Sequence, residues 1–153
     1  MTKALSRARP LLLDVNVLLA LAWPNHQFHN AVVERLDRRS SPTWATCLLT
    51  QLGFVRLSSN PAIVDVRQSP AQAIDLLQRL MSDEHHVYFG VLPTLDSVEG
   101  TFKKLLGHQQ VTDAYLVAVA AANDATLLTL DQRLVSTVVG GDRVEALLPQ
   151  RVK

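Results

Sequence analysis

Three aspartates are placed at the ends of apolar segments that lie far apart in the chain. Asp14 lies near the end of a predicted strand at 11–15, Asp131 directly follows another at 126–130, and Asp113 stands at the start of an almost wholly apolar segment. A lone carboxylate at the end of a buried strand is costly in free energy unless it is paired or bound to a metal ion. The three acids therefore predict a single cluster of negative charge.

Such a cluster is typical of a site for a divalent cation. The carboxyl ends of parallel strands share one edge of a sheet, where ligands bind in open α/β folds, so Asp14 and Asp131 can converge there. Asp113 can point to the same place from the start of a helix. Neighbouring carboxylates repel one another unless a cation keeps them ionised. Oxygen ligands without thiolates favour Mg²⁺, or Mn²⁺, over zinc, and such an ion can activate water for attack on a phosphodiester.

Each polar residue of the predicted site also has a purely structural explanation. Asp113 would lie in the first turn of a helix, where the helix dipole stabilises a carboxylate by about 0.3–1 kcal/mol, and Thr112 is the predicted N-cap. Asp131 could instead cap a helix at 132–137. Asn16 either holds a metal-bound water or caps the helical turn that follows it. It is the conjunction of the three acids that favours a functional site.

Strands and helices alternate along the predicted chain. Apolar runs indicate strands at 11–15, 43–47, 86–91 and 126–130, with a possible edge strand at 144–148. Helical spacing and turn residues indicate helices at 16–22, 27–39, 48–57, 70–81, 95–106 and 112–123. This order predicts an α/β fold with a mainly parallel sheet covered on both faces. The segment 112–123 is apolar all round, which indicates a buried helix.

Length and composition limit the classes of function. The 153 residues predict one domain spanning 1–153, with its core at about 10–148. A net charge of +1 gives no overall signal for binding a polyanion, so any nucleic-acid contact must use local basic patches. The single cysteine, Cys47, excludes an internal disulfide and a cysteine-based zinc site. With no signal peptide and no apolar run of about 20 residues, we expect no membrane association and a cytoplasmic location.

Four motifs in order resemble the PIN domain family. They are Leu-Leu-Asp-Val-Asn-Val-Leu-Leu-Ala at 12–20, Thr-Gln-Leu-Gly-Phe-Val-Arg-Leu at 50–57, Thr-Asp-Ala-Tyr-Leu at 112–116 and Leu-Leu-Thr-Leu-Asp at 127–131. Each motif alone is weak, but order and spacing match over roughly residues 10–140. At this length the chain is similar to VapC, the toxin half of a VapBC toxin–antitoxin pair.

The resemblance implies a fold, an activity and partners. The fold would be a three-layer α/β/α PIN-like fold with a mainly parallel sheet of four to five strands. The activity would be that of a Mg²⁺-dependent endoribonuclease (Mn²⁺ is the other candidate ion) acting on RNA. The protein would be a homodimer inhibited by a small VapB-like antitoxin. Asp14, Asp113 and Asp131 match three acidic positions of the family's site, and Thr112 could bond to one of these carboxylates.

Gln51 departs from the family pattern, which commonly has a glutamate at this position. A glutamine offers an oxygen but no charge, and it is a poor base, which disfavours a second metal ion. Asp96 could supply a replacement charge, or it could simply begin the next helix. The alternative function is therefore a catalytically weakened PIN-fold module that binds RNA or a protein partner.

Several other side chains are candidates for contact with RNA or with a partner. Trp23 and Trp44 could stack on bases, although core packing or an interface is favoured for both. The apolar residues Phe28, Val32 and Leu36 could form a dimer or antitoxin groove, or could belong to the core. The basic candidates for RNA contact, each also explicable as a solvated surface residue, are Arg56, Lys103, Lys104, His108 and Arg133.

A third class, phosphotransfer or dehalogenase-like chemistry, would use the first strand's aspartate as a nucleophile. Such sites usually need a second aspartate two residues later, where this chain has Asn16, or a nearby lysine, and no lysine closely follows the later strands. The first strand is also not followed by a glycine-rich phosphate loop. The sequence disfavours this class.

Overall fold

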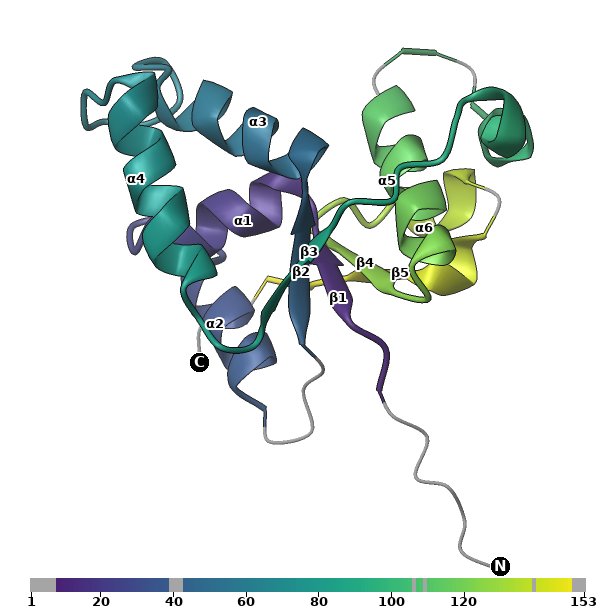
Figure 1. Cartoon of the computed structure of the whole chain (residues 1–153), viewed down its shortest axis with the longest axis horizontal. Coiled ribbons are helices and arrows are strands. Elements are labelled where there is room, and N and C mark those ends of the chain that lie inside the picture. The colour runs from purple at the N-terminus through teal and green to yellow at the C-terminus, as the bar shows by residue number, and fades with distance from the viewer. Residues whose placement is uncertain (1–7, 39–42, 106, 109, 139, 150–153) are drawn as a thin grey trace, which may run out of the picture.

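A parallel sheet forms the centre of the molecule (Figure 1). The computed structural model describes residues 8–38, 43–105, 107–108, 110–138 and 140–149. In these residues the sheet has five strands in the order β3-β2-β1-β4-β5, and every neighbouring pair is parallel. The strands are β1 (Leu11–Leu13), β2 (Trp44–Cys47), β3 (His86–Phe89), β4 (Thr126–Thr129) and β5 (Val144–Ala146).

Helices cover both faces of the sheet, as Figure 1 shows. On one face lie α1 (Val15–Ala22), α2 (His29–Asp37), α3 (Leu48–Ser58) and α4 (Pro70–Met81). On the other face lie α5 (Val111–Ala122) and α6 (Leu134–Thr137), together with the 3₁₀ helices η1 (Asp96–Phe102) and η2 (Gly141–Arg143). The predicted three-layer α/β/α fold, with its mainly parallel sheet of four to five strands, is confirmed. No described helix is long and apolar enough to cross a membrane.

The strand β1 joins the two halves of the core. Leu12 belongs to the core cluster under α5, whereas Leu11 and Leu13 belong to the cluster under α1 to α4. All three leucines are buried, as expected for a parallel strand covered on both faces. Since successive side chains of a strand alternate between faces, one short run of leucines anchors both helical layers.

Local signals in the sequence explain where α4 begins. The Ser69 hydroxyl accepts a hydrogen bond from the Gln72 backbone N–H at 3.1 Å, and the Gln72 side chain accepts one from the Ser69 N–H at 2.9 Å. Pro70 occupies the first turn, where its missing N–H costs nothing. This capping box confirms the predicted start, and such a cap stabilises a helix by about 1 kcal/mol.

The structure corrects several predicted boundaries. The first strand ends at Leu13, since the next residue caps α1. The helix expected at 95–106 is the shorter 3₁₀ helix η1, and residue 106 lies outside the described residues. The helix expected at 27–39 is α2, and its predicted last residue, 39, also lies outside the described residues. The helix α5 is buried at 114 and 116–120 as predicted, but Ala121 and Ala122 are exposed and line a shallow hollow beside η1.

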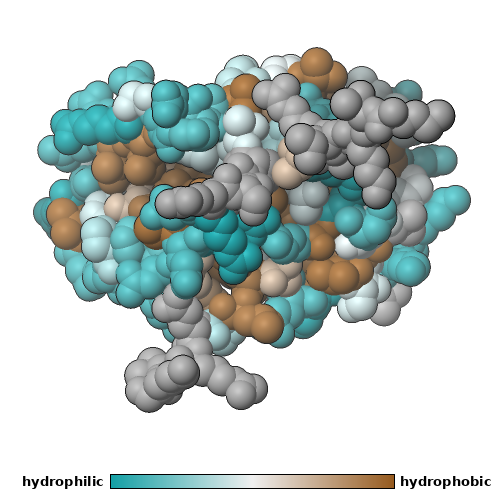
Figure 2. Space-filling model, turned by 90° about the horizontal axis from the view of Figure 1, so that it is seen from below, coloured by the Kyte–Doolittle hydropathy of each residue, from teal (hydrophilic) through white to brown (hydrophobic). Residues whose placement is uncertain are grey.

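Three apolar residues considered for a partner groove belong to the core. Val32 is fully buried, and Phe28 and Leu36 are partly buried against the same cluster, so the core interpretation holds for them. On the face seen in Figure 2, hydrophobic residues form several separate groups among hydrophilic ones rather than one continuous patch.

Candidate metal and active site

Asp14 connects the sheet to the first helix. Its backbone N–H extends the pairing of β1 with β4 by bonding to the Leu128 carbonyl at 3.1 Å. Its carboxylate then caps α1, because Oδ1 accepts a hydrogen bond from the Val17 N–H at 2.9 Å. Oδ2 accepts one from the Thr129 hydroxyl at 2.5 Å. The residue is only 4% exposed, so both carboxylate oxygens are held in a buried position.

Burial determines the protonation behaviour of Asp14. Removal from water raises its pKa from 3.8 to about 6, although the hydrogen bonds from Thr129 and Val17 oppose that rise. The negative charge of Asp113 raises the pKa of Asp14 further. A buried carboxylate in this condition is stabilised by a nearby cation, which favours its ionised form.

Asp113 interacts electrostatically with each of the other two acids. It is half-buried in the first turn of α5. Burial raises its pKa, and the negative charge of Asp131 raises it further. The fold thus brings the predicted acids from β1, α5 and the end of β4 into one group of interacting charges. Within the described residues, however, no three His, Cys, Asp or Glu side chains are close enough together to hold a metal ion between them.

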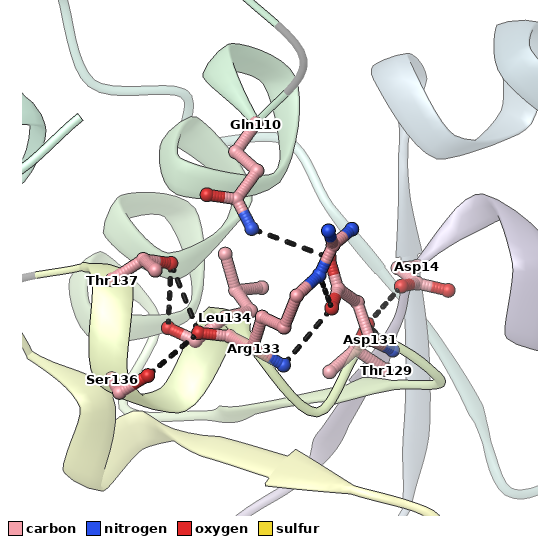
Figure 3. A network of polar contacts seen from close by, with 8 residues as sticks. All are labelled: Asp14, Gln110, Thr129, Asp131, Arg133, Leu134, Ser136 and Thr137. Carbon is pink, nitrogen blue, oxygen red and sulfur yellow. Dashed lines mark hydrogen bonds and ion pairs between the residues drawn. The ribbon is translucent and has the colours of Figure 1, made fainter. Parts of the chain in front are cut away.

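The Asp131 carboxylate is turned toward polar groups at the starts of α5 and α6 (Figure 3). Its Oδ1 accepts hydrogen bonds from the backbone N–H and the Nε–H of Arg133, at 3.0 and 3.3 Å, and its Oδ2 accepts one from Gln110 Nε2 at 3.3 Å. Burial acts to raise the pKa of Asp131, but the hydrogen bonds from Arg133 and Gln110 outweigh it, so this pKa is lowered. The carboxylate therefore closes the turn that precedes α6. The helix begins only at Leu134 and its N-cap is Arg133, so the predicted N-cap role of Asp131 for a helix at 132–137 was wrong.

Thr129 links Asp14 to Asp131, a role that its place in a predicted apolar strand did not indicate. Its hydroxyl donates to Asp14 and accepts a hydrogen bond from the Asp131 N–H at 3.1 Å (Figure 3). The side chain is fully buried. The available signal was a hydroxyl at the end of an apolar strand, two residues before an acid.

The supporting residues Asn16 and Thr112 do not have their predicted capping roles. Asn16 is exposed in the first turn of α1, because Asp14 already occupies the N-cap position. Thr112 is exposed inside α5, whose N-cap is Gln110, since the Gln110 carbonyl accepts the Ala114 N–H at 2.9 Å. Among the described residues, the Thr112 side chain makes no hydrogen bond to a carboxylate.

Gln51 is held by residues of β2 and α4. Its Nε2 donates to the Thr46 hydroxyl at 2.9 Å and contacts Met81 Sδ at 3.2 Å. The Thr46 hydroxyl also lies 2.9 Å from His86 Nε2. The amide nitrogen is thereby committed to this network. Asp96 is exposed and begins η1, in agreement with its structural interpretation.

The PIN domain family matches residues 11–139 of this sequence. The chain belongs to the PIN domain family. It is 38% identical over 131 residues to Ribonuclease VapC39 of Mycobacterium tuberculosis, covering 85% of this chain and 94% of that protein. It is 40% identical over 131 residues to Ribonuclease VapC44 of the same species, covering 85% and 92%.

Two solved structures share the fold of this PIN domain. One is the crystal structure of VapBC2 from Rickettsia felis bound to a DNA fragment from their promoter, with a TM-score of 0.61, 14% identity and coverage of 90% of this chain and 98% of that one. The other is PAE2754 from Pyrobaculum aerophilum, with a TM-score of 0.51, 22% identity and coverage of 89% and 85%. At these identities the likeness concerns the fold alone.

Three of the five predicted RNA contacts of the PIN domain line one hollow. Lys104, His108 and Arg133 border a depression of about 410 Å³, together with the Asp131 partner Gln110. Arg133, which contacts the Asp131 carboxylate at 3.3 Å, joins this hollow to the acidic group. Lys103 is exposed but does not line this hollow.

The remaining candidates lie elsewhere in the PIN domain. Arg56 is exposed on α3, in the opposite helical layer. Trp44 is buried and donates from its indole N–H to Asp83 at 3.1 Å, which confirms core packing. Trp23 is only half-buried and lines a separate pocket.

The acids of the PIN domain have the donor chemistry that suits a hard divalent cation, although their side chains are not gathered around a common point. Asp14 and Asp113 both have pKa values raised by burial and by a neighbouring negative charge, and a cation between them would relieve both effects. Carboxylate oxygens are the ligands that Mg²⁺ and Mn²⁺ prefer. Asp131 would have to exchange its bonds to Gln110 and Arg133 for a ligand position, or act through a bound water.

Proposed function

We propose that this PIN domain is the endoribonuclease toxin of a type II toxin–antitoxin pair. The two relatives compared above are named as ribonucleases. Its substrate would be RNA and its partner a VapB-like antitoxin, a proposal supported by the structural neighbour, which was solved as VapBC2. The functional unit would be a homodimer in the cytoplasm, with one PIN domain spanning the chain.

The main support for the proposal is the burial of the Asp14 carboxylate beside a second acid. A carboxylate this deeply buried, next to a second acid, costs free energy that a purely structural role does not require. The cost is explained when the group binds a divalent ion. Asp14 and Asp113 would be the main ligands of Mg²⁺ or Mn²⁺, with Asp131 as the third.

Each group of the chain would then have a distinct role. The bound ion would supply an activated water and stabilise negative charge on the phosphodiester. Thr129 holds the Asp14 carboxylate in place, and Val17 fixes its other oxygen. Lys104 and Arg133 would bind phosphates on the strand that leaves the site, because their charges line the adjoining hollow.

Cleavage of a fluorescently labelled RNA by purified protein, with Mg²⁺ varied, tests the proposal. We expect Asp14→Asn and Asp113→Asn to lower the cleavage rate by about a hundredfold or more, because even the outer partners of metal ligands are worth 10–100-fold. Asp75→Asn, which changes an exposed acid on α4, is the matched control and should leave the rate unchanged. If Asp14→Asn cleaved RNA as fast as the wild type, the proposed site would be wrong.

One observation favours the second candidate function, a PIN-fold module that binds RNA without cleaving it. Gln51 carries no charge, and its amide nitrogen is committed to Thr46. A Mg²⁺ titration separates the two functions, with RNA binding and RNA cleavage measured on the same wild-type sample. Binding that saturates without turnover at any Mg²⁺ concentration would favour the module.

A further inference from the structure

A pocket of about 500 Å³ runs along α1, the helix that Asp14 caps. Asn16, Leu19 and Trp23 line it at intervals of three and four residues, so they share one face of the helix. Asn16 lies two residues after Asp14. With a rise of 1.5 Å per residue, the pocket spans roughly 10 Å of the helix axis, from Asn16 to Trp23, and ends about 13 Å beyond the level of Asp14. One nucleotide of an RNA strand in the active site would reach it.

The pocket has an aromatic wall that is held in place. The Trp23 indole N–H lies 3.5 Å from the Ser58 hydroxyl, and Ser58 is fully buried at the end of α3. Leu57 of the same helix also lines the pocket. The segment after α3 contributes Ile63 and Val66, both more than half exposed. A flat apolar ligand could therefore lie between the indole and these aliphatic side chains.

The rim of the pocket is polar. Asn16, Asn25 and Asp65 are exposed, and among the described residues their side chains make no hydrogen bond with the protein. His26 is also in the lining, and its Nδ1 accepts the Phe28 N–H at 3.1 Å. Burial and the neighbouring His29 lower the pKa of His26, which favours the neutral ring, and a neutral ring whose Nδ1 accepts a hydrogen bond carries its hydrogen on Nε2. The rim thus offers both donors and acceptors.

The charge of the lining excludes a phosphate as the occupant. Among the described residues that line this pocket there is no Lys or Arg, and Asp65 adds a negative charge. Basic side chains line the other hollow instead, in the α5 and α6 layer. The two hollows flank the acids from opposite helical layers, so a strand that crosses the acids could place phosphates in one hollow and a base in the other.

We propose that the pocket along α1 binds a nucleobase of the RNA strand next to the cleaved phosphodiester. The base would stack on Trp23, as unpaired bases stack on aromatic side chains, and its edge would bond to the rim. A carboxylate at the rim accepts hydrogen bonds from an exocyclic amino group. Uracil has no exocyclic amino group and offers only its N3–H, so we expect Asp65 to favour adenine, cytosine or guanine over uracil. This inference rests on the proposed ribonuclease function, and it adds a determinant of where RNA is cut.

Trp23 provides a direct optical test. Trp23 and Trp44 are the two tryptophans of the chain, so Trp44→Phe leaves Trp23 as the sole indole emitter. Asp113→Asn is added so that the RNA stays intact, and circular dichroism checks the fold. Hexamers of adenylate, cytidylate and uridylate are then titrated with Mg²⁺ present. We expect adenylate or cytidylate to quench Trp23 and to bind about tenfold more tightly than uridylate.

Substitutions in the pocket should change base selection rather than the chemistry. Trp23→Leu should weaken hexamer binding by about tenfold, measured by fluorescence anisotropy of labelled RNA. Asp65→Asn should reduce the preference against uridylate. Ile74→Ala removes an exposed apolar side chain of α4 outside the pocket and should change neither quantity.

The outcomes separate this proposal from the proposed function. If no hexamer quenches Trp23, and Trp23→Leu cleaves RNA with unchanged rate and base preference, the base site is wrong while the ribonuclease stands. That result would leave the pocket to a protein partner. If quenching is selective among the hexamers but the wild type cleaves no RNA, the base site stands and the catalytic proposal fails.

Discussion

The hydroxyl of Thr129 donates a hydrogen bond of 2.5 Å to Oδ2 of Asp14, across 115 positions of sequence. The same hydroxyl accepts the N–H of Asp131 at 3.1 Å. Register explains the contact, because Leu13 pairs with Leu128 in the parallel ladder between β1 and β4. The residues that follow this pair, Asp14 and Thr129, therefore lie side by side at the edge of the sheet.

Thr129→Val keeps the shape of the side chain and removes both hydrogen bonds. We expect a loss of about 1–3 kcal/mol in the free energy of unfolding, because Asp14 loses a buried partner. RNA cleavage should fall as well, since the carboxylate is no longer fixed. Urea unfolding and a cleavage assay on the same sample measure the two effects. Thr126→Val in the same strand is the control and should change stability by less than about 0.5 kcal/mol.

The raised pKa of Asp14 predicts how stability depends on pH in metal-free buffer. Between pH 3.8 and about 6 the folded chain holds the Asp14 proton more tightly than the unfolded chain does. The free energy of unfolding therefore falls as pH rises through this window, by about 3 kcal/mol from this group. The pKa of Asp113 is also raised, so it contributes in the same direction.

Asp14→Asn should flatten this part of the pH profile, and Asp75→Asn should not. Urea unfolding at a series of pH values from 4 to 8, in buffer with a chelator, gives both profiles. Identical profiles for the wild type and Asp14→Asn would show that the buried carboxylate is not the source.

Gly53 permits a close approach of α3 to the start of α1. A Cβ at this position would lie 2.5 Å from Val15 Cγ2, next to Asp14 in sequence. Gly53→Ala must therefore displace Val15, and overpacking of this kind costs about 1–3 kcal/mol. Gly100→Ala is the control, since its Cβ would meet no atom within 4 Å. Thermal unfolding and the cleavage rate of both variants check whether the change near Val15 reaches the active site.

Gln51→Glu should strengthen Mg²⁺ binding if the missing negative charge at position 51 limits the affinity for the ion. We expect the Mg²⁺ concentration for half-maximal cleavage to fall by about tenfold, an effect typical of groups around a metal site. Gln51→Ala separates the added charge from loss of the bond to Thr46. An unchanged Mg²⁺ requirement in Gln51→Glu would indicate that position 51 does not act on the metal.

The basic hollow should bind the RNA backbone rather than a particular base. Lys104→Ala should weaken binding of all RNA sequences to a similar extent and reduce the slope of log K against log salt concentration by about 0.7. Lys103→Ala removes the same charge one residue away, outside the hollow, and should have a smaller effect. Fluorescence anisotropy at several salt concentrations measures the slopes. Equal slopes for the two variants would contradict the assignment.

The sequence by itself predicted the fold class and the positions of the three acids. A run of three leucines ending at Asp14 and an apolar strand ending before Asp131 reveal where buried strands stop, because strand burial is a local pattern. The start of α4 was predictable for the same reason, since the capping box of Ser69 and Gln72 spans only four residues. Signals contained in a few consecutive residues can be interpreted without the fold.

Only the tertiary structure decided which residues from distant parts of the sequence contact these acids. Thr129 contacts Asp14 because of strand register, and Gln110 contacts Asp131 because α5 packs beside the end of β4. The capping roles predicted for Asn16 and Thr112 were wrong because the N-cap residues of α1 and α5 are Asp14 and Gln110. The pocket at Trp23 likewise needs α1, α3 and the segment after α3 together. Such contacts depend on packing between separate parts of the chain, which no short stretch of sequence specifies.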